Sequence, residues 1–150
     1  SNQDQYKILK DKALKENSEF IPLSIKLEAE ISELEQNEKK VFLRDLGINE
    51  PALERLIKTS YSSLGLGTFF TAGEKEVRSW ILKKGSLAPE AAGVIHSDFQ
   101  KGFIRAEVIS FDDYITYQGD QGAKIAGRLR SEGSEYVVNE GDVILFRFNV

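Results

Sequence analysis

The carboxyl-terminal stretch EGSEYVVNEGDVILFRFNV, residues 132–150, decides the fold of this chain. Strands alternate their side chains between two faces, and residues 143–150 show that period of two. The apolar side chains predicted for one face are Ile144, Phe146, Phe148 and Val150. The turn 139–142, Asn-Glu-Gly-Asp, precedes this strand, and residues 136–138 are predicted to form another strand before the turn.

Upstream segments extend this pattern into a complete sheet. Residues 104–109 alternate apolar and charged positions, as expected for a half-buried strand. Residues 68–70, TFF, and 76–82, EVRSWIL, are two candidate strands separated by a glycine-containing turn, so they predict a hairpin. Pro89 suits the first position of a short helix that continues to Ile95. The resulting order β-β-α-β-β-β predicts an α+β chain with a β-grasp (ubiquitin-like) fold, in which a sheet wraps around one helix.

The first half of the chain has a different character. Gly47 is the only glycine among residues 1–64, whereas eleven glycines follow. We expect helices that begin near Asp4, Ser24, Asn37 and Pro51. The glutamates of the second of these helices, Glu28 among them, are expected on its solvated face.

The segment FIPL, residues 20–23, predicts a short buried strand with no neighbouring strand in this half. Because an isolated strand is unstable, the first half resembles the end of a sheet whose other strands lie elsewhere. The sequence also lacks methionine, which predicts a piece of a longer chain.

Composition excludes several kinds of site. The chain has no cysteine, so disulfides, thiolate metal sites and cysteine nucleophiles are absent. One histidine cannot form a multi-histidine metal site within a single chain. A net charge of −4 gives no general attraction for nucleic acid, and no apolar run has the roughly 18 residues of a membrane helix. These features fit a cytoplasmic protein.

Three long stretches resemble the TGS domain of the Obg-like ATPase family, also called YchF. They are TFFTAGEKEVRSW (68–80), KKGSLAPEAAGVIHSDFQKGFIRAEVIS (83–110) and the terminal stretch quoted above. The segment IPLSIKLEAEI (21–31) is similar to the last strand, the nucleotide-base loop and the final helix of the family's GTPase-like domain. The resemblance implies a TGS domain at 65–150, preceded at 1–64 by a mainly helical remnant of the P-loop α/β domain with linking helices.

The resemblance also implies a function. The intact parent is expected to be a P-loop ATPase or GTP-binding protein that uses ATP or GTP with Mg²⁺ and acts with the ribosome or RNA. Ser24, Ile25 and Lys26 correspond to the base loop, although the family favours Ser-Ala-Lys there. Residues 133–136, Gly-Ser-Glu-Tyr, replace a favoured Gly-Lys-Asp-Tyr and lose one positive charge.

The loop that holds nucleotide phosphates, G-x-x-x-x-G-K-[ST], does not occur in this sequence. We therefore expect no catalytic residue, cofactor or metal in the chain itself. Its expected role is regulatory and partner-binding. The expected partners are the ribosome or RNA and the upstream nucleotide-binding domain. Binding to DNA or to a membrane is not expected.

Four basic residues are the candidates for RNA or ribosome contact: Lys83, Lys84, Lys101 and Arg105. Simple surface solvation is the alternative for them, and Arg128 and Arg130 share the same two interpretations. Trp80 is interpreted as packing on the sheet and not as a base-stacking platform. Residues 111–127 interrupt the strand series and are the predicted partner-facing element, with a short helix around Tyr114 and a loop at 119–122.

The only histidine, His96, stands two residues before Asp98 and raises the alternative of acid–base catalysis. No nucleophile or substrate-binding motif accompanies the pair, so a role at the end of the preceding helix is favoured. A self-standing β-grasp interaction module without nucleotide turnover is a further alternative. A ubiquitin-type carrier would need a terminal Gly-Gly, whereas this chain ends Arg-Phe-Asn-Val.

Overall fold

A computed structural model describes residues 2–73 and 76–149 of the chain. The chain divides into two compact units, Ser1–Leu64 and Gly65–Val150, and each is described by itself. In the described residues, no helix is long and apolar enough to span a membrane.

The first unit consists of helices joined by short connections. They are α1 (Asn2–Lys15), α2 (Ile25–Glu33), α3 (Gln36–Asp45) and α4 (Ala52–Ser63). Ser24 caps α2 as predicted, because its hydroxyl accepts a hydrogen bond from the N–H of Leu27 at 3.4 Å. Gly47 follows α3 with φ of 67°, a left-handed conformation that suits glycine at a helix end.

Several predictions for the first unit are wrong in detail. Helix α1 begins at Asn2 and not at Asp4, and Glu35 in place of Asn37 caps α3. The larger error concerns residues 20–23, which are extended but form no strand. A strand needs a hydrogen-bonded neighbour, and the described part of the chain pairs nothing with this segment.

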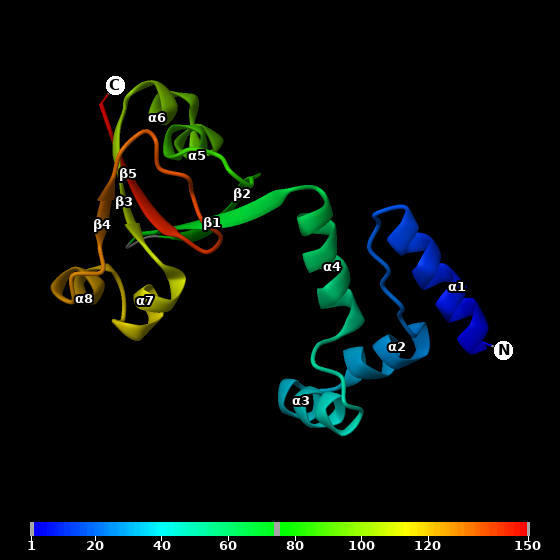
Figure 1. Cartoon of the computed structure of the whole chain (residues 1–150). Coiled ribbons are helices and arrows are strands. Elements are labelled where there is room, and N and C mark those ends of the chain that lie inside the picture. Colours follow the sequence, from blue (N-terminus) through cyan, green and yellow to red (C-terminus); the bar gives the residue numbers. More distant parts are fainter. Residues whose placement is uncertain (1, 74–75, 150) are drawn as a thin grey trace. The chain divides into compact units, whose positions relative to one another are not determined.

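The second unit contains a mixed five-stranded sheet with the order β2-β1-β5-β3-β4. The strands are β1 (Leu66–Ala72), β2 (Val77–Lys83), β3 (Phe103–Ile109), β4 (Arg130–Glu132) and β5 (Val143–Phe148). Strands β1 and β2 form the predicted antiparallel hairpin, while the adjacent strands β1 and β5 run parallel. Figure 1 shows β1 and β5 passing through the middle of the sheet.

Four short helices accompany the sheet: α5 (Ala88–Ile95), α6 (Ser97–Lys101), α7 (Phe111–Thr116) and α8 (Asp120–Ile125). Helix α5 buries three alanines against the strands. The buried core residues are Phe69, Leu82, Ala88, Ala91, Ala92, Ala106, Val108, Val138, Ile144 and Phe146. Phe148 stacks on Phe99 of α6 with ring centroids 3.8 Å apart. The period-two pattern of β5 therefore places Ile144 and Phe146 in the core, as predicted, whereas Val150 lies outside the described residues.

Three predictions made from the sequence of this unit are wrong. Residues 136–138 form one isolated bridge, Leu87 to Val137, and the strand near this position is β4 at 130–132. The predicted loop at 119–122 instead begins α8. Ile104 was grouped with buried positions but is 56% exposed, because the pairing of β3 with β5 shifts between Phe103 and Arg105.

Candidate partner-binding sites

The three residues that correspond to a nucleotide-base loop lie at the start of α2. The hydroxyl of Ser24 caps this helix by accepting the hydrogen bond from Leu27. The side chain of Ile25 is 80% exposed, and Lys26 is also exposed. A ligand at this turn would therefore meet Ile25 and Lys26, while the Ser24 hydroxyl already accepts a hydrogen bond from the helix.

Glu28 has a structural role that the sequence analysis missed. Its carboxylate accepts hydrogen bonds from the N–H groups of Ala52, at 2.8 Å, and Leu53, at 3.5 Å. These groups begin α4, whose first N–H groups have no partner within the helix. Glu28 thus joins α2 to α4. Its partners lie more than 20 residues away along the chain, so no local sequence pattern indicates this role.

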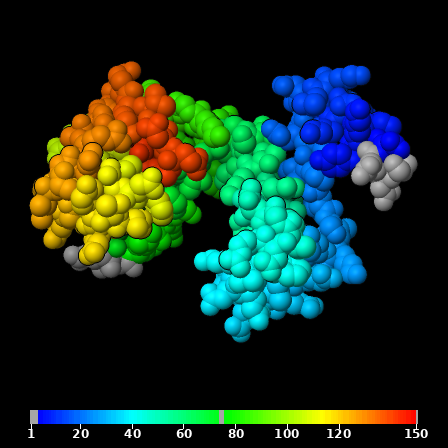
Figure 2. Space-filling model, turned by 60° about the horizontal axis from the view of Figure 1, so that its bottom comes forward, coloured from blue at the N-terminus to red at the C-terminus, as the bar shows by residue number. Residues whose placement is uncertain are grey.

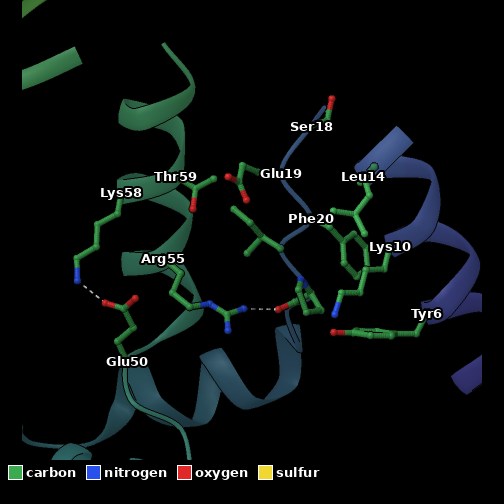
Figure 3. Close-up of a pocket in the computed structure, with 13 residues that line it drawn as sticks. Tyr6, Lys10, Leu14, Ser18, Glu19, Phe20, Glu50, Arg55, Lys58 and Thr59 are labelled. Carbon is green, nitrogen blue, oxygen red and sulfur yellow. Dashed lines mark hydrogen bonds and ion pairs between the residues drawn. The ribbon is translucent and has the colours of Figure 1, made fainter. Parts of the chain in front are cut away.

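A cleft of about 480 Å³ lies between α1, the extended residues 18–22 and α4. In Figure 3 the ring of Tyr6 lies near Phe20, and their centroids are 5.2 Å apart. Arg55 donates a hydrogen bond from Nη2 to the carbonyl of Pro22 at 2.8 Å, and Lys58 pairs with Glu50. Two cations of α4 are therefore engaged by neighbouring groups.

The four predicted contact residues form two groups on the second unit. Lys83 of β2 lies opposite Leu66 of β1. Leu66 precedes Phe70 by four residues, and Phe70 pairs with Val143 of the parallel strand β5. Arg105 lies opposite Arg147, four residues after Val143 on β5. At about 3.3 Å per residue, the two positions lie about 26 Å apart along the strands. Lys84 follows Lys83, and Lys101 ends α6 close to Arg105 in the chain.

The two groups also differ in the availability of their charges. Lys83, Lys84 and Lys101 take part in none of the ion pairs formed by the described residues. Arg105 instead donates to Glu107 at 3.0 Å. The three lysines are therefore the freer phosphate ligands.

Glu107 bridges two arginines on neighbouring strands. Arg147 of β5 donates to one carboxylate oxygen at 2.9 Å, and Arg105 donates to the other at 3.0 Å. The hydrogen bond from Arg147 lowers the pKa of Glu107, against the opposing effect of burial, and the bond from Arg105 lowers it further. The carboxylate therefore neutralises part of the positive charge that this end of the sheet would otherwise present.

His96 lies at the junction of α5 and α6, as predicted for a residue at a helix end. Its backbone N–H donates to the carbonyl of Ala92 at 3.2 Å and ends α5, while its Nδ1 accepts a hydrogen bond from the N–H of Asp98 at 3.2 Å and caps α6. The same nitrogen lies 3.4 Å from the Asp98 carboxylate, which it can pair with only when protonated. Among the described residues, no cluster of three or more potential ligands could hold a metal ion, so the His96–Asp98 pair is not part of a metal site there.

Arg130 belongs to a polar network that the sequence did not indicate. The Tyr136 hydroxyl donates to Asp142 at 2.7 Å and accepts a hydrogen bond from Arg130 at 3.0 Å. Asp142 is buried, and it also accepts from the N–H of Asn139 at 2.9 Å. Burial raises the pKa of Tyr136, and the hydrogen bond to Asp142 adds to this effect. The network holds residues 136–142 in place, which is a structural role for Arg130.

Residues 111–127 form two short helices on the surface of the second unit, and Figure 2 shows α7 exposed there in yellow. Ile115 and Ile125 are 60% and 90% exposed. Arg128, which follows the segment, lies 3.8 Å from Asp113. The predicted partner-facing element is thus accessible. Its predicted short helix around Tyr114 is α7, whereas α8 occupies the position predicted as a loop at 119–122.

Comparison with known proteins identifies relatives over nearly the whole chain. The family model YchF-GTPase_C, described as a protein of unknown function (DUF933), matches residues 66–149. The "Ribosome-binding ATPase YchF" of Bacillus subtilis (strain 168) is 58% identical over 142 residues, which are 95% of this chain and 39% of that protein. The protein of the same name from Escherichia coli O157:H7 is 54% identical over 138 residues, 92% of this chain and 38% of the relative.

A solved structure agrees with these sequence matches. The Schizosaccharomyces pombe YchF GTPase matches with a TM-score of 0.81 and 33% identity, over 98% of this chain and 38% of that one. The chain thus spans less than two fifths of the length of each of these relatives. Because the family model covers more than half of the residues and the sequence identities are high, the chain belongs to the YchF family.

Proposed function

We propose that this chain is the regulatory, partner-binding carboxyl-terminal region of an Obg-like P-loop ATPase that acts with the ribosome. The observation that carries the proposal is the 58% identity over 142 residues to a protein named a ribosome-binding ATPase. The chain corresponds to 39% of that relative and lacks the phosphate-binding lysine loop, so ATP turnover is proposed to belong to the rest of the protein. Ribosome binding would place the intact protein in the cytoplasm.

The second unit is proposed to be a TGS domain of the β-grasp type. The support is the strand order β2-β1-β5-β3-β4, with β1 and β5 parallel and α5 packed on one face through its alanines. The three sequence stretches that resemble TGS domains fall within this unit.

The first unit is proposed to be the end of a nucleotide-binding domain. Its extended segment, residues 19–23, pairs with no strand among the described residues, and the cleft beside it is lined by Leu14 and Phe20. Among the described residues of this unit, only Ile31, Leu43 and Ala52 are buried hydrophobics. Strands contributed by the upstream domain would give the extended segment neighbours and cover these apolar side chains.

The nucleotide phosphates and Mg²⁺ do not fit the residues present. The sequence lacks the glycine-rich lysine loop, and the described residues include no cluster of three potential metal ligands. Ser24, Ile25 and Lys26 offer at most a contact with the nucleotide base. ATP or GTP with Mg²⁺ is accordingly assigned to the intact parent alone.

Contact with ribosomal RNA is proposed for Lys83, Lys84, Lys101 and Arg105, as two groups at opposite ends of the sheet. Lysine ammonium groups without an ion-pair partner can bind phosphates and release counterions. The three lysines fit this role, whereas Arg105 would have to exchange its bond with Glu107 for a phosphate.

Co-sedimentation with purified ribosomes tests the proposal. The chain should pellet with ribosomes at low salt, and binding should weaken steeply as salt rises, because phosphate contacts release counterions. The double variant Lys83→Glu, Lys84→Glu and the double variant Lys101→Glu, Arg105→Glu locate the contact. Lys10→Glu with Lys12→Glu, on α1, is the charge-matched control. Pelleting that ignores salt and both variants would place the interface elsewhere, with residues 111–127 next to test.

A further inference from the structure

Among the described residues of the second unit, one long sheet edge pairs with no further strand. Strand β2 is at the end of the strand order, beside β1 alone. It is seven residues long, contains no proline and pairs with β1 in unbroken register from Val77 to Lys83. The opposite edge strand, β4, has three residues. Long edges without a bulge or a proline are the ones that accept another strand.

The register determines which backbone groups of β2 face outward. The N–H of Gly73 donates to the carbonyl of Glu76, and the N–H of Lys84 donates to the carbonyl of Gly65. Antiparallel pairs alternate between bonded and non-bonded positions, so the even-numbered residues of β2 bond to β1. Val77, Ser79 and Ile81 therefore direct their N–H and C=O groups to the open edge.

The side chains along this edge define what would pair with it. Val77 is 72% exposed and Ile81 is 47% exposed, and both lie on the sheet face opposite α5. Residues 77–84 carry three positive charges, Arg78, Lys83 and Lys84, and no negative charge. Arg78 lies 3.9 Å from the exposed carboxylate of Glu76 and over the ring of Trp80, so a peptide carboxylate would have to compete with Glu76 for it. A second copy of the strand would bring like charges together, whereas an acidic strand would be attracted.

We propose that the β2 edge binds an extended acidic peptide that adds to the sheet as a further strand. Its backbone would pair with Val77, Ser79 and Ile81, aliphatic side chains would pack beside Val77 and Ile81, and its carboxylates would face Arg78 and Lys83. RNA lacks the alternating N–H and C=O groups that this edge requires, so the backbone pattern favours a polypeptide. This inference is independent of ribosome contact.

Amide hydrogen exchange measured by NMR on the whole chain tests the proposal. The probe is the peptide acetyl-Asp-Val-Glu-Val-Glu-Ile-Asp-Asp-amide, at up to about 1 mM. Binding should slow exchange at the amides of Val77, Ser79 and Ile81, whereas those of Arg78, Trp80 and Leu82 are already bonded to β1. A peptide with lysine in place of every acidic residue should produce no such change.

Two variants separate backbone pairing from charge. Ser79→Pro removes an N–H that faces the open edge, so the peptide should bind about tenfold more weakly or worse while the hairpin with β1 remains. Arg78→Glu should weaken binding by a similar factor, and Lys124→Glu on α8 is the matched charge control.

Several results would overturn the proposal. They are no binding of the acidic peptide at the highest concentration, equal binding of the lysine peptide, and binding without protection at Val77, Ser79 and Ile81. If polyuridylate, tested in parallel, slows exchange at the same alternate amides, the edge is not selective for a polypeptide. Because the protection pattern is read on the unmodified chain, unfolding of Ser79→Pro would leave this test intact.

Discussion

Gly102 shows how single residues set the close packing of the second unit. A Cβ built at Gly102 would fall 1.9 Å from the carbonyl oxygen of Asn149, whose N–H donates to the Gly102 carbonyl at 2.9 Å. Its φ of −92° is open to any residue, so the requirement for glycine is steric. Gly122 is similar, because a Cβ there would lie 1.8 Å from the carbonyl oxygen of Tyr117.

Gly102→Ala should therefore lower the free energy of unfolding by about 2–3 kcal/mol, because backbone must move to admit the methyl group. Gly133→Ala is the control, since a Cβ at Gly133 meets nothing within 4 Å. Urea denaturation of both variants measures the difference. Equal stability of the two variants would contradict this prediction, because it would show that the backbone at Asn149 moves away from the added methyl group at little cost.

His96→Ala should cost about 1 kcal/mol, the usual effect of losing a helix cap. His96→Asn should cost less, because its side-chain carbonyl can accept the hydrogen bond from the N–H of Asp98. Thermal unfolding compares the two variants. If asparagine is as harmful as alanine, the imidazole acts through something other than capping.

The ionisation of Glu107 makes the free energy of unfolding of the second unit depend on pH. The pKa of its carboxyl is lower in the folded chain than the ordinary value of 4.5, chiefly because of the hydrogen bond from Arg147. Its stabilising effect is thus complete above the unfolded pKa and disappears as pH falls through the lower, folded pKa.

Glu107→Gln should reduce the free energy of unfolding by about 1 kcal/mol at pH 7, a value typical of a partly exposed ion pair. The difference from the unmodified chain should shrink below about pH 4.5 and vanish in stronger acid. Urea denaturation at a series of pH values measures it. A difference that stays constant into acid would mean that the carboxylate charge contributes nothing.

At the scale of elements, the sequence predicted those with a clear local signal. Strand β5 has a period of two, the hairpin of β1 and β2 flanks a glycine-containing turn, and helix α5 begins at a proline, and the structure contains all three. Strand β4 was missed because three residues are too few to show a period, and its pairing with β3 is set by the fold. Helix α8 was missed because Gly119 and Gly122 indicate a loop, whereas Gly122 is needed for close contact with Tyr117.

The candidate sites were less predictable than the elements. The sequence offered Lys83, Lys84, Lys101 and Arg105 together as candidates for RNA or ribosome contact, but strand register separates them into two groups. Residues 20–23 have the composition of a strand, yet strand formation depends on a partner that local sequence does not supply. Long-range pairing decided both cases.

At the scale of the whole molecule, the chain should show no ATP or GTP hydrolysis above background. The groups that stabilise the charge developing on the transferred phosphoryl, a P-loop lysine and its Mg²⁺, have no counterpart in the sequence. Release of inorganic phosphate from each nucleotide is the measurement. Turnover that follows the protein through a further purification step would contradict the assignment of hydrolysis to the rest of the parent.

The proposed function depends on a difference in packing between the two units. The second unit has a contiguous core around Phe69, Ile144 and Val108, whereas the described part of the first unit leaves Ile8, Leu9 and many other apolar side chains exposed. Opening of such loosely packed helices costs little free energy, so their amides exchange quickly.

Hydrogen exchange on the dilute chain, read residue by residue, tests this difference most directly. Amides of residues 143–148 should exchange slowly, at rates set by global unfolding of the second unit, while those of residues 4–25 should exchange fast. Equal protection of the two regions in a monomer would contradict the account, because the first unit would then possess a core of its own and would not be the end of a nucleotide-binding sheet.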